Sequence, residues 1–176
     1  MSGRSASAAP LRAVSARGGE PADAELLARH LQGDPDAFGS LFRRHKQELW
    51  AVAIRLLGDV GLAAQAIQDA MVLAFWKVPE LGGGDVVTTW LHRIVVNVCL
   101  DRMRSFPPPA DDGDVMAALR HLDVEQQSAL VLVDMLGFSV ADACEILGVS
   151  ADALLSRRDR GRARLVTELT HLQQAR

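Results

Sequence analysis

Residues 139–165 read SVADACEILGVSADALLSRRDRGRARL, and this stretch carries the strongest local fold signal in the chain. Ser139 followed by Asp142 has the spacing of a capping box, which predicts that a helix begins there. Gly148 can adopt a positive φ and end that helix in a tight turn, and Ser150 can cap a second helix. A helix, a short glycine turn and a second helix at this spacing predict a helix-turn-helix. We expect four side chains of the motif to face inward: Val140, Cys144, Leu147 and Leu154.

The second helix of this motif, expected over about 151–172, is strongly basic. Such a helix would lie in the major groove of DNA, where guanidinium groups contact phosphates and guanine edges. A helix that is merely basic and solvated is the alternative interpretation. The arginines concerned are Arg157, Arg158, Arg160, Arg162 and Arg164.

The charge pattern around the motif favours an anion-binding face. The net charge of the whole chain is only −3, which by itself does not indicate a nucleic-acid binder. Residues 105–152 contain nine acidic residues and one basic residue, whereas residues 153–176 contain six arginines and two acidic residues. This separation of charge suggests that the end of the chain binds an anion locally.

The rest of the back half is also expected to be helical. Its helices should cover about 114–121 and 123–136, followed by the two helices of the motif at 139–147 and 151–172. The preceding stretch 106–113, FPPPADDG, is rich in Pro and Asp and predicts a short linker. We therefore place a domain boundary there and assign residues 114–176 to a back domain.

The front half, residues 21–105, shows four helical segments. They are expected at about 23–32, from Pro35 (with Asp34 as its cap) to about 56, at 60–78 and at 87–104. Residues 1–20 have no periodicity and predict a disordered tail. The expected buried side chains are Phe38, Leu41, Phe42, His45, Leu49, Val52 and Leu56 in the second helix; Ala63, Ala66, Ile67, Ala70, Met71, Ala74 and Phe75 in the third; and Trp90, Leu91, Ile94, Val95 and Val98 in the fourth.

No strand pattern occurs, so the sequence predicts an all-α fold of two small helical domains. Composition argues against several classes of protein. The two cysteines, Cys99 and Cys144, lie in apolar helical patterns, and no Cys/His cluster has the spacing of a metal site. We find no nucleophile motif and expect no cofactor, no metal and no enzymatic activity. No apolar run approaches the roughly 20 residues that span a bilayer, so we expect a cytoplasmic protein without membrane insertion.

Several motifs together resemble the extracytoplasmic-function (ECF) branch of bacterial RNA polymerase sigma factors, in particular its actinobacterial sigma M type. Any one of these motifs is weak, but their order and spacing are specific. They are Asp36-Ala37-Phe38 with Leu41 to His45; Gln68-Asp69-Ala70-Met71; Thr89 to Asn97 with Asp101-Arg102; Leu147 to Ser150; and Ser156-Arg157.

The resemblance implies that the front domain is sigma region 2, which binds the polymerase clamp and recognises and melts the −10 promoter element. The back domain would be region 4, which binds the polymerase flap and reads the −35 element. The implied partners are core RNA polymerase, promoter DNA and an anti-sigma factor. The implied polymerase-binding residues are Gln65, Gln68, Asp69, Val72 and Trp76. The implied DNA-binding residues are Arg93, Asn97 and Arg104 in the fourth helix and Ser150, Ser156, Arg157, Arg160 and Arg162 in the motif, and the glycine-rich loop 80–87 would hold a flipped base.

The sequence departs from the family pattern at the recognition helix, at Gln65 and at the linker. An acidic residue that the family usually carries near Gln65 is missing. The nine residues 105–113 span at most about 30 Å when fully extended, whereas family linkers are far longer. These departures keep an alternative open, a sigma-like polymerase-binding regulator that no longer initiates efficiently. The recognition helix has Leu155 in place of Lys or Arg, Arg158 in place of an apolar residue, Asp159 in place of an aromatic residue or His, and Gly161 in place of Ala.

Overall fold

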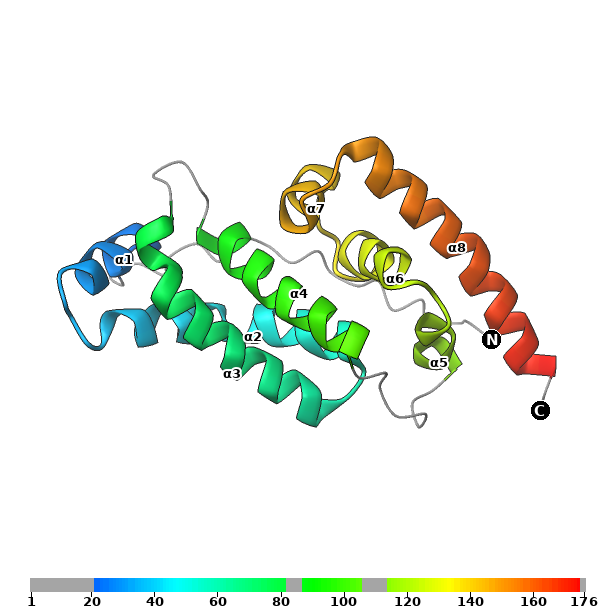
Figure 1. Ribbon diagram of the computed structural model, residues 1–176, viewed down its shortest axis with the longest axis horizontal. Coiled ribbons are helices and arrows are strands. Elements are labelled where there is room, and N and C mark those ends of the chain that lie inside the picture. The colour runs from blue at the N-terminus through cyan, green and yellow to red at the C-terminus, as the bar shows by residue number, and fades with distance from the viewer. Residues whose placement is uncertain (1–20, 82–86, 106–113, 175–176) are drawn as a thin grey trace, which may run out of the picture.

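The front half of the chain forms a four-helix unit (Figure 1). The computed structural model describes residues 21–81, 87–105 and 114–174. The predicted tail 1–20, most of the glycine-rich loop and the predicted linker 106–113 therefore lie outside the described residues. The elements are α1 (Asp23–Leu31), α2 (Ala37–Leu57), α3 (Val60–Lys77), a 3-10 turn (Val78–Glu80) and α4 (Val87–Ser105).

The back half is helical as well. Within the described residues no strand occurs, and the predicted all-α fold with two helical halves is confirmed. The back half contains α5 (Asp114–Arg120), α6 (Val124–Leu130) continuing as a π-helical turn η2 (Val131–Met135), α7 (Val140–Leu147) and α8 (Ala151–Gln174).

The helix boundaries follow local capping signals, with one correction. The side chain of Asp59 caps α3 by accepting a hydrogen bond from the amide of Leu62 at 2.6 Å, and Gly58 ends α2 with a φ of 66°. The predicted start of α2 at Pro35 is wrong, because the helix begins at Ala37. Asp34 instead stabilises the preceding turn, where its carboxylate accepts from the amide of Asp36 at 3.0 Å.

The front core is built around α2, which packs against α1, α3 and α4. The predicted stripe of α2 is buried throughout, including His45, whose Nε2 lies 2.8 Å from Asp23. In α3 the small residues of the stripe are buried as predicted, but Met71 and Phe75 are each 40% exposed. In α4 Trp90 is buried, as predicted from its place in the apolar stripe, and Val98 is only half-buried.

The two halves pack directly against each other, an arrangement that the sequence did not predict. Helix α4 contacts α7 and α6, and apolar residues of both halves form one continuous core (Figure 1). Gln127 in α6 is buried and donates from Nε2 to the carbonyl of Leu56 at the end of α2 at 3.0 Å. The ring of Phe138, just before α7, meets the buried ring of His92 in α4 with centroids 5.0 Å apart.

Candidate functional site

The outer face of α3 carries the residues that we expect to contact polymerase. All five are exposed, and the two apolar ones are 54% (Val72) and 73% (Trp76) exposed. The buried stripe of α3 lies on the opposite side of the helix, so the five side chains form one solvent-facing surface. We call this surface the α3 face, and it consists of Gln65, Gln68, Asp69, Val72 and Trp76.

One arginine from the neighbouring helix reaches the α3 face. Arg102 in α4 donates from Nη1 to Oε1 of Gln65 at 3.1 Å, and its Nη2 forms a short ion pair with Oδ2 of Asp69. The side chain of Arg102 is 18% exposed and that of Asp69 is 57% exposed. The sequence motif contained Arg102, but spacing along the chain could not indicate that it bonds two residues of another helix.

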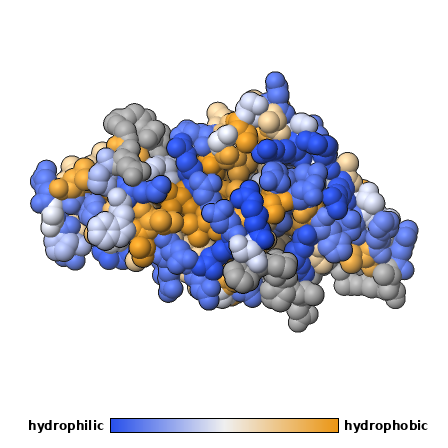
Figure 2. Space-filling view, viewed as in Figure 1, coloured by the Kyte–Doolittle hydropathy of each residue, from blue (hydrophilic) through white to orange (hydrophobic). Residues whose placement is uncertain are grey.

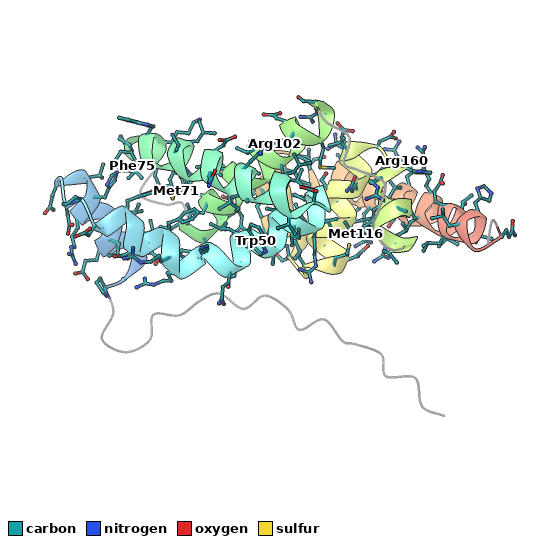
Figure 3. The ribbon with its side chains drawn as sticks, turned by 90° about the horizontal axis from the view of Figure 1, so that it is seen from below. Trp50, Met71, Phe75, Arg102, Met116 and Arg160 are labelled. Atoms are coloured by element: carbon teal, nitrogen blue, oxygen red, sulfur yellow. The ribbon has the colours of Figure 1, made fainter. Side chains whose placement is uncertain are left out.

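Apolar and aromatic side chains border the α3 face. The ring of Phe75 lies 4.6 Å from His30 and 5.4 Å from Phe38, which explains why a residue predicted to be buried is instead shared between helices and solvent. Figure 3 labels Met71 and Phe75 along α3, and Figure 2 shows apolar surface over α3 and α4. A polar surface with an exposed apolar centre is typical of protein interfaces.

The outer face of α4 carries Arg93, Asn97 and Arg104, the residues implied in strand capture. Asn97 and Arg104 are exposed, and Arg93 is half-buried. Both cations already have acidic partners from the back half. Arg93 pairs with Glu145 of α7 at 3.0 Å, and Arg104 lies 3.6 Å from Glu125 of α6. In this arrangement the back half therefore neutralises cations of the predicted DNA face.

The helix-turn-helix geometry agrees with the sequence prediction. The hydroxyl of Ser139 accepts from the amide of Asp142 at 3.1 Å, and Gly148 has a φ of 66°. Ser150 caps α8 by accepting from the amide of Ala153 at 3.3 Å. The inward stripe is shifted, however. Leu154 is buried as predicted, but Ala143 and Ile146 are the fully buried residues of α7, whereas Val140, Cys144 and Leu147 are half-buried.

Several arginines of α8 are paired with carboxylates. Arg162 is held by both carboxylate oxygens of Asp134, at 2.5 and 2.7 Å, and Arg158 lies 3.2 Å from Asp159. Arg160, labelled in Figure 3, is exposed and bonds only the carbonyl of Ser156 at 3.3 Å among the described residues. Ser150 and Ser156 are exposed. The Asp134–Arg162 pair could not be predicted from the sequence, because its members lie in different helices.

Arg157 faces the other half of the molecule. Together with Arg104 it lines a cavity of about 220 Å³ between α4, α6 and the turn before α8. The rest of the wall is mixed: Leu100, Val124 and Val149 are among its apolar side chains, and Glu125 and Ser128 are polar. Arg157 is half-buried in this position. Contact between Arg157 and DNA therefore requires that the two halves move apart.

Burial favours the neutral forms of two groups in the core, His92 and Cys99. His92 donates from Nδ1 to the carbonyl of Thr88 at 2.7 Å, and its buried Nε2 has no hydrogen-bond partner. Burial lowers the pKa of His92 to about 4 and raises the pKa of Cys99 to about 12. Among the described residues, no group of three His, Cys, Asp or Glu side chains could hold a metal ion. No helix in the described ranges is long and apolar enough to cross a membrane.

Comparison with known protein families gives two matches in the order of the two halves. The Sigma-70 region 2 family matches residues 41–105, and the Sigma-70 region 4 family matches residues 112–165. An ECF RNA polymerase sigma factor of Mycobacterium tuberculosis, SigM, is 42% identical over 171 residues, which cover 87% of each chain. This chain belongs to the ECF sigma factor family. The family binds RNA polymerase and directs transcription initiation at promoters, so the predicted membership, including the similarity to the sigma M type, is confirmed.

Solved structures of sigma factors share the fold. CnrH, solved in complex with the cytosolic domain of CnrY, is 29% identical with a TM-score of 0.70, and the match covers 85% of this chain and 97% of CnrH. The sigma factor RpoE of Bartonella quintana, solved with the anti-sigma factor NepR, is 26% identical with a TM-score of 0.65, and the match covers 77% of this chain and 98% of RpoE. The all-α architecture of this ECF sigma factor therefore extends to experimental structures of its relatives.

Proposed function

We propose that core RNA polymerase docks its clamp on the α3 face of this sigma factor. The face supplies a carboxylate, two amides and two exposed apolar side chains on one helix. This combination suits a protein interface, because the apolar centre gives affinity and the polar groups give register. The sigma factor itself performs no catalysis in this proposal, since the polymerase carries out the chemistry.

We further propose that the outer face of α4 recognises and holds the melted −10 element. Two cations, Arg93 and Arg104, can contact phosphates, and the exposed amide of Asn97 can contact a base edge. All three lie on one helix, α4. Trp90 of the same helix is not part of this face, because it is buried in the core.

The −35 element is assigned to the helix-turn-helix. Its second helix, α8, presents Ser150, Ser156 and Arg160 to solvent, and Arg157 and Arg162 become available when their present neighbours are displaced. Region 2 then comprises residues 21–105 and region 4, which also binds the polymerase flap, residues 114–176. The segment 106–113 would connect them.

An anti-sigma factor is the third proposed partner. Two sigma factors of the same fold were solved in complexes. CnrH was solved with the cytosolic domain of CnrY, and RpoE was solved with the anti-sigma factor NepR. We propose that this chain, acting in the cytoplasm, is controlled in the same manner.

The packing of the two halves affects whether the molecule initiates transcription or acts as a regulator that only binds polymerase. Reading two promoter elements requires that α4 and α8 both be free, yet Glu145 pairs with Arg93 and Arg157 faces α4. Initiation therefore requires opening of the molecule. If the molecule stays closed on polymerase, it acts as the alternative, a polymerase-binding regulator that does not initiate.

The proposed docking of polymerase rests on the α3 face, and charge reversal at Asp69 tests it. We expect Asp69→Arg to abolish binding to purified core polymerase, because it places a cation where the partner meets a carboxylate. Glu25→Arg, an exposed reversal on α1, should bind like the wild type. Circular dichroism melts of both variants establish that they are folded. Wild-type affinity of a folded Asp69→Arg variant would refute the α3 face.

A further inference from the structure

We infer that Arg102 is a positioning residue of the polymerase interface, which fixes Gln65 and Asp69 in the orientation that polymerase meets. The inference rests on the proposed docking of polymerase on the α3 face. Arg102 itself belongs to α4 and is largely covered, so it acts through the two α3 residues (Figure 3).

The geometry is that of one planar fork holding two side chains. Gln65 and Asp69 lie four residues apart and therefore one above the other on α3. The Nη1 of Arg102 donates to the amide oxygen of Gln65 at 3.1 Å, and Nη2 donates to Oδ2 of Asp69. A guanidinium can make both bonds at once because its donors are coplanar, whereas an ammonium is a point charge.

The guanidinium has no competing hydrogen bonds. In the described part of the chain its Nε is buried without a partner, and its two terminal nitrogens bond only these α3 residues. The side chain lines a groove between α3 and α4 together with Leu73, Val98 and Ser105. Arg102 therefore lies in this groove directly beside the α3 face, and its two bonds to Gln65 and Asp69 set its position.

The remaining acceptor of Asp69 stays available to a partner. Its Oδ1 accepts no hydrogen bond from any described residue, and more than half of the side chain is exposed. Holding a side chain in one orientation before binding removes the entropy cost of ordering it at the interface. A partly exposed ion pair adds little to fold stability, so preorganisation for binding is the larger consequence.

The test measures the dissociation constant of the full-length chain with purified core RNA polymerase. Arg102→Met should weaken binding about tenfold, since two interface side chains become mobile. Arg102→Lys should weaken it less, since it keeps the ion pair with Asp69 and loses only Gln65. Arg29→Met, which removes the exposed Arg29–Asp34 pair at 2.7 Å on another part of the surface, is the matched control and should bind like the wild type. Thermal melts verify that each variant is folded at the assay temperature.

A second comparison separates positioning from a general effect on the fold. If Arg102 acts through Gln65, Arg102→Lys should cause no further loss of affinity in a chain that already carries Gln65→Ala. Unchanged or tighter binding by Arg102→Met, or an equal loss from Arg102→Lys in both backgrounds, overturns the inference. If Asp69→Arg abolishes binding while Arg102→Met has no effect, only this inference fails. If Asp69→Arg binds normally, the proposed α3 face itself fails.

Discussion

At the scale of single residues, the clearest departure from the family pattern has a steric cause. Gly161 stands in α8 where the family resemblance led us to expect Ala. A Cβ added there would lie 3.0 Å from Cδ1 of Leu130 and 3.3 Å from the backbone carbonyl of Gln126. The close approach of α8 to α6 therefore favours glycine at this position. From the sequence alone, glycine inside a helix indicates only a cost in helix propensity, because the partner helix lies about 30 residues earlier.

We predict that Gly161→Ala lowers the free energy of unfolding by about 1 kcal/mol, since overpacking outweighs the gain in helix propensity. Gly39→Ala in α2 is the matched control. Its Cβ would meet only the flexible end of Arg43 at 3.4 Å, so it should stabilise the chain by about 0.5–1 kcal/mol. Urea unfolding monitored by circular dichroism measures both. A stabilised Gly161→Ala variant would show that α8 can shift away from α6.

His92 makes stability depend on pH. Burial lowers its pKa to about 4 from the usual 6.5. Above pH 6.5 the imidazole is neutral in both states and contributes nothing. As the pH falls from 6.5 towards 4, the unfolded chain binds a proton that the folded chain does not, so the folded state loses stability. We expect the free energy of unfolding to fall by about 2 kcal/mol between pH 7.5 and pH 5 through this group.

The control is His92→Gln, which keeps a side-chain donor and does not titrate. Its unfolding free energy should change less over the same pH range, as measured by urea titrations at each pH. Asp23 and Asp34, whose pKa values are lowered, lose their contribution only as the pH falls below their usual value of 3.8. The same pH slope in both chains would show that His92 is not the titrating group.

At the scale of helices, sequence periodicity located every described helix, because the apolar positions repeat with the helical period. The errors arise where tertiary contacts decide. Met71 and Phe75 fit the stripe of α3 but lie at its edge, half in solvent. Periodicity also assigned the predicted polymerase-binding and DNA-binding residues to faces of their helices. Their ion-pair partners could not, since these come from other helices.

The ion-pair partners matter most in α8, the predicted recognition helix. Arg158 and Arg162 pair with Asp159 and Asp134, and in the proposed −35 contact these carboxylates would compete with DNA phosphates for the same guanidinium groups. We predict that Asp134→Asn with Asp159→Asn tightens binding of holoenzyme to −35 DNA and steepens its salt dependence by about one to two units, since each freed cation adds about one phosphate contact.

Fluorescence anisotropy at several salt concentrations measures both quantities. Glu25→Gln with Asp36→Asn changes the net charge equally on exposed residues of the front half, and it should leave the salt slope unchanged. An equal steepening in this control would mean that only the overall charge of the protein matters.

At the scale of the whole molecule, the sequence predicted two domains but not their shared core. Contacts such as Gln127 with Leu56 join residues 71 positions apart. No periodic pattern indicates such contacts. The helices of each half have the same amphipathic pattern whether their apolar faces pack within that half or against the other half. The closed arrangement places Glu145 of the back half against Arg93 of the predicted DNA face.

We predict that Glu145→Lys favours separation of the halves, because it replaces an ion pair with two like charges at the junction. Energy transfer between dyes on α1 and α8 should then decrease in the free protein, and the decrease should be smaller at high salt. Glu25→Lys makes the same charge change far from the junction and should leave the transfer unaltered. No difference between the two variants would indicate that apolar packing alone holds the halves together.

Run-off transcription with purified core polymerase tests the central claim most directly. The chain should direct a transcript of defined start from a duplex promoter, and core polymerase alone should not. If Asn97 holds the melted strand, Asn97→Ala should lose far more activity on the duplex than on the same promoter with a pre-melted bubble. Absence of a transcript from both templates, despite binding of the chain to core polymerase, would contradict the account and leave the non-initiating regulator.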